Sequence, residues 1–196
     1  MNSAFYPLAV FFAAVFTNNI LLANYLGMCS FLSVSRELKT SVGLGAAVTF
    51  VMATTSLLNW LVYHYILLPL GLDYLRFIVF IVVIAAFVQL VEMIIERVSE
   101  TLYAALGIFL PLITVNCAIL GVCLFMVIRE YDLLSSFTFG LGSGIGWFLA
   151  ILAMAGIRLK LARARVPRGL EGAGITLIIT GMMALAFMGF TGMIRL

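Results

Sequence analysis

The chain has 196 residues, of which 65% are hydrophobic and only 10% charged, and its mean hydropathy is +1.24. Because soluble chains carry about 25% charged residues, this composition excludes an ordinary soluble domain. The net charge of +3 comes from one basic loop, RLKLARARVPRGLEG (158–172), which is typical of a cytoplasmic loop of a membrane protein and gives no evidence of a nucleic-acid partner.

Six stretches without charged residues follow one another along the chain. About 18 apolar residues suggest a transmembrane helix, and in lipid every backbone amide must be satisfied within its own segment. Five stretches exceed that length, and the third reaches it once Glu92 is included. The stretches are 1–35, 40–72, 77–91, 101–128, 133–157 and 172–194. We therefore predict an all-α polytopic membrane protein with six transmembrane helices.

The basic residues of the connections predict the orientation. The first, third and fifth connections hold eight Lys and Arg residues, and the remaining connections and the two ends hold three. The eight are Arg36, Lys39, Arg97, Arg158, Lys160, Arg163, Arg165 and Arg168. Since Lys and Arg concentrate in cytoplasmic loops, we expect the odd connections inside and both termini outside. The segment before Arg36 lacks the basic start of a cleaved signal, so we expect it to form the first span.

Six spans divide naturally into three and three, residues 1–98 and 99–196. VSRELKTSVGLGAAVTFVMA (34–53) and VIREYDLLSSFTFGLGSGIGWFLA (127–150) share V-x-R-E followed by G-L-G, although the offsets differ by four residues. Three helices are an odd number, so a repeat would enter the membrane from the opposite side. We predict two inverted three-helix repeats, an arrangement associated with midplane sites and broken helices.

The first span of each half is interrupted by polar residues and glycine. The first contains NNILLANYLGMCSF (18–31), and the fourth contains ALGIFLPLITVNCAILGVC (105–123). Pro111 removes a helix hydrogen bond and clashes with the preceding turn. Freed backbone groups and Asn side chains are tolerated at membrane depth only against protein or water. The two interruptions therefore indicate a functional site in the interior.

Cys29 and Cys117 each follow one of these interruptions. In an inverted pair they would approach one another near the midplane, where a metal cluster stabilises thiolates by taking up their charge. The alternative is that each is a small apolar filler, the role we assign to Cys123. An odd number of cysteines, all within spans, argues against disulfides. A [2Fe–2S] cluster normally takes four ligands, so a second polypeptide would have to supply the rest.

The other candidates have weaker signals. His64, the only histidine, is typical of an interfacial aromatic belt, with a haem or metal ligand as the alternative. Glu92, near Gln89, is a snorkelling or paired carboxylate, or else part of an ion path. The glycines of GLGSGIGW (140–147) give G-x-x-x-G twice and predict close helix packing instead of a phosphate loop. The sequence contains no nucleophile–base set and no nucleotide fingerprint.

Several long motifs resemble one family across nearly the whole chain. They are NNILLANYLGMCSFLSVS, VQLVEMIIERVSETLYAALGIFLPLITVNCAILG, GSGIGWFLAILAMAGIR and TGMMALAFMGFTG. The family is the NqrDE/RnfAE group of bacterial membrane subunits. LGMCSFL, ITVNCAI, GSGIGW and VPRGLEGAGIT look like NqrE, a subunit of the sodium-translocating NADH:quinone oxidoreductase (Nqr). The pair Asn18–Asn19 and the connection LLPLGLDYLR look more like RnfA of the Rnf complex, so Nqr is the favoured reading and Rnf the alternative.

The resemblance implies a redox function in the bacterial inner membrane, with both termini periplasmic. Family members pair with a homologous sister subunit of opposite orientation, which is NqrD in Nqr or RnfE in Rnf. Together the two subunits enclose a [2Fe–2S] cluster. The motifs LGMC and VNC make Cys29 and Cys117 the implied ligands, and Cys123 matches none. The cluster would relay single electrons from NADH towards quinone, coupled to outward sodium movement.

The resemblance also implies what the chain lacks when it stands alone. It would be one subunit of a translocase, without activity in isolation and without a flavin of its own. Two other classes of function stay open from the residues themselves. One is a cofactor-free secondary transporter or channel, and the other is a structural membrane scaffold.

Overall fold

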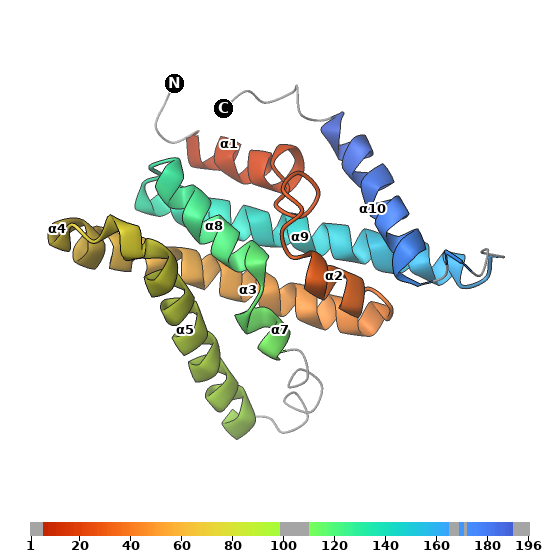
Figure 1. Cartoon of the computed structure of the whole chain (residues 1–196), viewed down its shortest axis with the longest axis horizontal. Helices are drawn as coiled ribbons and strands as arrows, with labels where there is room; N and C mark the ends of the chain where they lie inside the picture. The colour runs from red at the N-terminus through yellow and green to blue at the C-terminus, as the bar shows by residue number, and fades with distance from the viewer. Residues whose placement is uncertain (1–5, 99–109, 165–168, 171, 190–196) are drawn as a thin grey trace.

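The computed structural model describes residues 6–98, 110–164, 169–170 and 172–189, and every regular element in those ranges is helical. The π-helices η1 and η2 and the 3-10 helix η3 connect or extend the α-helices (Figure 1). In chain order the elements are α1 (Tyr6–Phe12), η1 (Ala13–Thr17), α2 (Met28–Val34), α3 (Leu38–Val62), η2 (Tyr63–Leu67), α4 (Leu68–Leu70), η3 (Asp73–Leu75), α5 (Arg76–Val98), α7 (Leu110–Thr114), α8 (Cys117–Ile128), α9 (Leu133–Leu161) and α10 (Ala173–Met188).

Helices α3 and α9 lie side by side and antiparallel at the centre of the molecule (Figure 1). Small residues let their backbones approach. A Cβ atom added to Gly144 would lie 2.8 Å from the Cα atom of Thr49, and one added to Gly140 would lie 3.0 Å from the carbonyl oxygen of Met52. Close approach of this kind is what small residues provide between helices in a membrane. The predicted packing role of these glycines is therefore confirmed.

A second glycine pair of α9 packs against a different helix. A Cβ atom on Gly142 would lie 2.8 Å from the carbonyl oxygen of Phe11, and one on Gly146 would lie 2.9 Å from that of Val15. Helix α9 is thus in close contact with α3 through one G-x-x-x-G pair and with α1 and η1 through the other. The sequence predicted close packing but not that it serves two partners.

Within the described parts of the chain, four helical segments are long and apolar enough to cross a membrane, so the chain is a multi-pass membrane protein. They are Leu38–Leu70, Asp73–Ile94, Pro111–Ile128 and Leu133–Leu161, with shorter apolar helices at Tyr6–Thr17 and Ala173–Met188. The all-helical, polytopic part of the predicted fold class is confirmed. Six spans and two inverted repeats, 1–98 and 99–196, stay predictions.

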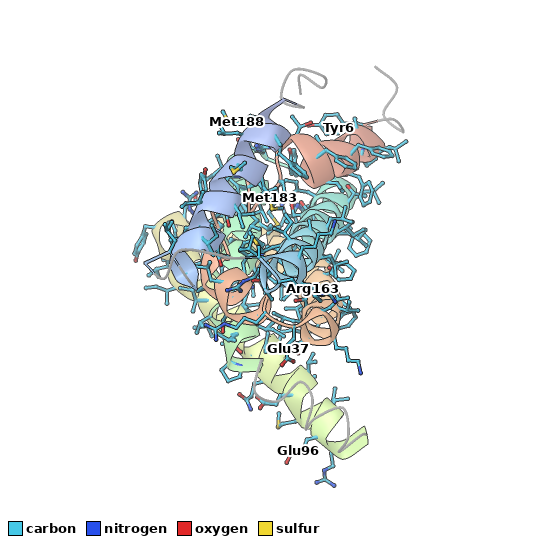
Figure 2. The ribbon with its side chains drawn as sticks, turned by 90° about the vertical axis from the view of Figure 1, so that its right-hand side faces the viewer. Tyr6, Glu37, Glu96, Arg163, Met183 and Met188 are labelled. Atoms are coloured by element: carbon cyan, nitrogen blue, oxygen red, sulfur yellow. The ribbon has the colours of Figure 1, made fainter. Side chains whose placement is uncertain are left out.

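Hydrogen bonds bring alternate connections to the same end of the molecule. The Arg158 side chain donates from Nη1 to the carbonyl oxygen of Leu32 at 3.0 Å and to Ser35 Oγ at 2.7 Å, which joins the end of α9 to the first connection. Figure 2 looks onto this end, where Glu37 and Arg163 are labelled. At the other end, Trp60 Nε1, near the end of α3, donates to the carbonyl oxygen of Tyr131 in the fourth connection at 2.9 Å.

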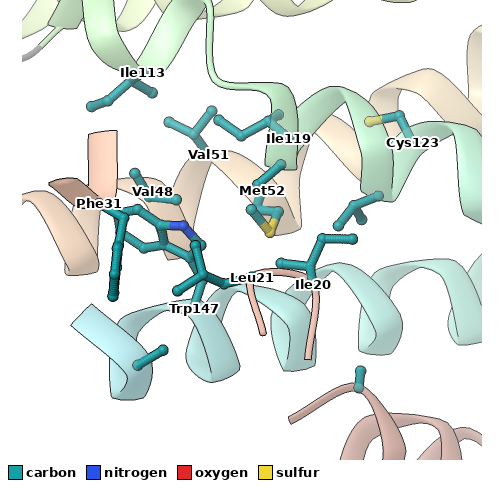
Figure 3. Close-up of a cluster of buried hydrophobic side chains, with 14 of the residues drawn as sticks. Ile20, Leu21, Phe31, Val48, Val51, Met52, Ile113, Ile119, Cys123 and Trp147 are labelled. Carbon is teal, nitrogen blue, oxygen red and sulfur yellow. The ribbon is translucent and has the colours of Figure 1, made fainter. Parts of the chain in front are cut away.

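The hydrophobic core lies where α3, α8, α9 and the first interruption meet. Trp147, Phe31 and Met52 are fully buried there, beside Ile119 (Figure 3). Helix α5 adds mainly one stripe of residues, including Phe80, and is otherwise exposed and apolar (Figure 1). An apolar exposed surface of this kind is suited to lipid or to another membrane subunit.

Candidate functional site

The first interruption separates η1 from α2. Regular helix ends at Thr17 and begins again at Met28, and between them the chain forms turns. Tyr25 has a φ of 55° and Gly27 a φ of 83°, both in the left-handed region. This is the interruption that the polar residues of the first stretch predicted.

Asn19 explains how polar groups are tolerated in this interruption. Its side chain is 1% exposed, and Nδ2 donates to the carbonyl oxygens of Gly146 at 2.8 Å and Val15 at 3.2 Å. Its Oδ1 accepts from the amides of Leu21 at 3.1 Å and Leu22 at 3.3 Å. One buried amide group therefore satisfies two backbone donors freed by the break and ties the break to α9.

The second interruption lies between α7, which ends at Thr114, and α8, which begins at Cys117. Asn116 caps α8, because its Oδ1 accepts from the amide of Ala118 at 3.0 Å. Pro111 is a residue of α7, and the observed break falls after it, between Thr114 and Cys117. The residues before α7 at which Pro111 was expected to kink the chain lie outside the described residues.

The two interruptions are in direct contact. Gly27 lies two residues before Cys29. Its amide donates to Cys117 Sγ at 2.9 Å. Asn116 Nδ2 donates to Ser30 Oγ at 3.3 Å, and Ser30 Oγ donates to the carbonyl oxygen of Gly27 at 3.1 Å. The structure therefore brings together the segments of both candidate cysteines, which are far apart in sequence.

The two cysteines are exposed, whereas the side chains that hold their segments are buried. Cys29 and Cys117 both reach the surface, and Ser30 is 0% and Asn116 2% exposed. Cys29 is the second residue of α2 and Cys117 the first residue of α8. The arrangement presents two exposed cysteine sulfurs on segments that touch one another.

This pair fits half of an iron–sulfur site and does not fit a whole one. Thiolates are the ligands that iron–sulfur clusters take, normally four of them. Among the described residues, no group of three or more His, Cys, Asp or Glu side chains lies close enough to hold a metal ion. A cluster at Cys29 and Cys117 therefore requires ligands from a second chain.

Gly27 is a site residue to which the sequence assigned no role of its own. Besides its left-handed φ, a Cβ atom there would lie 2.7 Å from Trp147 Nε1, 3.1 Å from the Cβ of Ala118 and 3.2 Å from Asn116 Oδ1. Any other residue would thus strain the backbone and separate the two interruptions. The signal in the sequence was a glycine directly before a short helix.

The remaining candidate residues take no part in the contact between the two interruptions. Cys123 is fully buried in the core and accepts from Asn59 Nδ2 at 3.1 Å, which agrees with its predicted role as a filler. His64 is exposed near the end of the second stretch and stacks on Trp60, with ring centroids 4.9 Å apart, as expected of an interfacial aromatic belt. On α5, Gln89 is exposed and Glu92 half-buried, and the role of Glu92 stays a prediction.

Comparison with known proteins gives concordant matches. Residues 8–194 match the family model described as "Rnf-Nqr subunit, membrane protein". The chain is 56% identical to the E subunit of the Na(+)-translocating NADH-quinone reductase of Serratia proteamaculans, covering 94% of this chain and 96% of that protein. It is 50% identical, with the same coverage, to the A subunit of the Na(+)-translocating ferredoxin:NAD(+) oxidoreductase complex of Acetobacterium woodii. It is 51% identical to the E subunit of the Na(+)-translocating NADH-quinone reductase of Chlamydia trachomatis, over 94% of this chain and 81% of that protein.

Proposed function

The chain belongs to the Rnf-Nqr family of membrane subunits, and from this premise we propose that it is a membrane subunit of a redox-driven sodium pump. Relatives from both complexes are sodium-translocating oxidoreductase subunits, so the enzyme is a translocase and this chain one part of it. The LGMCSFL and ITVNCAI motifs favour the place of NqrE, and that of RnfA is the alternative. No activity is expected from the isolated chain.

Within that complex, Cys29 and Cys117 hold one half of a [2Fe–2S] cluster, and a homologous sister subunit supplies the other two sulfurs. One observation carries this proposal. The amide of Gly27, beside Cys29, donates to the sulfur of Cys117, and both thiols are exposed on the surface. When bound, such a cluster accepts and passes on one electron at a time.

The residues of this chain bind and orient the cluster. The Gly27 amide remains a hydrogen-bond donor to the Cys117 sulfur, which stabilises negative charge there. The Asn116–Ser30 bond fixes the spacing of the two cysteine segments, and Trp147 closes the site from the interior. The exposed side of the pair is where the sister subunit docks and excludes lipid and water.

The proposed arrangement in the bacterial inner membrane follows from the same features. One interrupted helix in each half supports inverted repeats over 1–98 and 99–196, because broken helices in corresponding positions mark such folds. The end that carries Arg158 and the first connection faces the cytoplasm, and both termini are periplasmic. Sodium is handled by the complex, and no flavin is expected on this chain.

Electron paramagnetic resonance of the purified, reduced complex tests the cluster. Replacing Cys29→Ser or Cys117→Ser should abolish the signal of the membrane cluster and lower the iron content, because each variant removes one of four ligands. Cys123→Ser is the matched control and should retain both, since Cys123 is buried in the core. An undiminished cluster signal in the Cys29 and Cys117 variants would refute the assignment.

A cofactor-free secondary transporter is the second candidate, favoured by the two broken helices alone. It predicts sodium flux by the isolated chain in liposomes without an electron donor or quinone. The pump subunit predicts flux only in the whole complex during turnover.

A further inference from the structure

A cavity of about 410 Å³ lies at the end of the molecule opposite Arg158. On one side of it are η2 and α4, and on the other is the turn from α8 to α9. Figure 1 shows these elements at the left. Its lining includes Trp60, Tyr63 and His64 from α3 and η2, and Glu130 and Asp132 from the turn between α8 and α9, where both acidic residues are exposed. The cavity is separate from the cysteine pair, and the proposed cluster does not use it.

The aromatic side of the cavity is held in a fixed position. The His64 ring stacks on the Trp60 ring with centroids 4.9 Å apart and planes 11° apart. Trp60 Nε1 donates to the carbonyl oxygen of Tyr131 at 2.9 Å, which ties the aromatic side to the turn that carries both carboxylates. The two sides of the cavity therefore form one preorganised unit.

The basic residue of this turn is engaged elsewhere. Arg129 Nη1 donates to the hydroxyl of Tyr131 at 3.1 Å, and the guanidinium lies over the rings of Phe125 and Phe139 at 5.9 Å and 5.7 Å. Its charge is thus directed at aromatic side chains of α8 and α9.

The two acidic residues lie in the turn between α8 and α9, and neither is a helix cap that bonds through its side chain. Asp132 directly precedes α9, but its side chain makes no capping hydrogen bond. Glu130 has a φ of 52°, an uncommon conformation for a residue other than glycine. Two negative charges beside aromatic faces attract a cation.

Geometry and size decide which kind of cation fits. Among the described residues, no three His, Cys, Asp or Glu side chains are grouped closely enough for a metal ion. The volume of about 410 Å³ is within the range of about 300–1,000 Å³ for small-molecule sites. An organic ammonium group, bound by carboxylates and ring faces together, matches both findings.

The surroundings of the cavity belong to a membrane interface. Tyr65 and Tyr74 are 69% and 76% exposed at the same end, and exposed Tyr and Trp mark the boundary of a bilayer. Leu68 lines the cavity, and Phe77 and Ile78 at the start of α5 are exposed apolar residues on which acyl chains can lie. Arg76, the first residue of α5, places a positive charge near Tyr63 of the cavity lining.

We infer that this cavity binds the ammonium headgroup of an aminophospholipid, with phosphatidylethanolamine as the probe. Glu130 and Asp132 pair with the ammonium group, the rings of Trp60 and His64 cover it, and the acyl chains extend along α5. The inference does not depend on the cluster, so it can stand or fall independently of the proposed function.

Native mass spectrometry of the purified complex, delipidated and given defined lipids, tests the site. Wild type should retain phosphatidylethanolamine in preference to phosphatidylglycerol at this site. In the double variant Glu130→Gln/Asp132→Asn that preference should fall about tenfold, because both charges that pair with the ammonium are removed. Glu96→Gln, an exposed carboxylate on α5, is the control and should behave as wild type.

Three results would overturn the inference. One is equal retention of the two lipids by wild type, and another is an unchanged preference in the double variant. The third is displacement of the lipid by millimolar glycerophosphoethanolamine, which would assign the site to soluble amines. Carbodiimide cross-linking in the native complex provides a further check, because a bond from Glu130 to a lysine of another subunit would make the cavity a protein interface.

Discussion

At the scale of single residues, the site depends on a glycine that no side chain can replace. Gly27→Ala would place a methyl group against Trp147 and hold alanine in the left-handed region. We expect a loss of about 1–2 kcal/mol in stability from the backbone alone, and a larger loss of cluster content as the Cys29 and Cys117 segments separate. Thermal unfolding and iron analysis of the purified complex measure both. Gly43→Ala, a helical position with nothing within 4 Å, should leave both unchanged or slightly improved.

A second prediction at this scale concerns Asn19. Asn19→Leu keeps approximate size but leaves the amides of Leu21 and Leu22 without their acceptor in a buried site. Buried donors without partners cost about 1–3 kcal/mol each, so we expect strong destabilisation and poor accumulation in the membrane. Asn24→Leu, at an exposed position of the same interruption, is the control. Equal melting temperatures for the two variants would contradict the role assigned to Asn19.

At the scale of elements, the sequence predicted where the helices break more reliably than how. Both interruptions could be located from Asn19, Asn116 and the nearby glycines. A buried polar group in an apolar run costs free energy unless it is hydrogen-bonded, so such residues indicate a break in the helix. The kink expected at Pro111 falls on residues before α7 that are outside the described residues, so it stays a prediction, whereas the break at Asn116 is observed. The contact of Gly27 with Cys117 joins residues 90 apart, and no local pattern encodes such a contact.

The short helix α2 is positioned by a residue far away in the sequence. Arg158 donates to the Leu32 carbonyl near the end of α2, and Cys29 lies at its beginning. Arg158→Gln should therefore loosen α2 and make the already exposed Cys29 more mobile, giving faster alkylation of this thiol in cluster-free protein. Lys160→Gln, an exposed neighbour, is the control. An unchanged alkylation rate would show that the Arg158 bonds do not position the cysteine.

For the whole molecule, periodicity and composition predicted an all-helical membrane protein because lipid leaves the backbone few alternatives. The arrangement of the helices could not be predicted in the same way. The two G-x-x-x-G pairs of α9 predicted close packing. Only the structure shows that Gly144 packs against α3 and Gly146 against η1. Which apolar faces remain outside is also decided by tertiary packing, as the largely exposed α5 illustrates.

Orientation is the property of the whole chain that one experiment can decide. If the basic connections face the cytoplasm, Arg163→Cys should react with a membrane-impermeant maleimide only after cells are permeabilised. Tyr74→Cys, at the opposite end and 76% exposed, should react in intact cells. Wild type labelled in parallel corrects for Cys29 and Cys117. Because the bond from Trp60 to Tyr131 holds the turn before α9 beside the end of α3, a Leu133→Cys variant should be labelled as Tyr74→Cys is. The reverse pattern would place the basic end outside, and the direction of electron flow through the cysteine pair would have to be inverted with it.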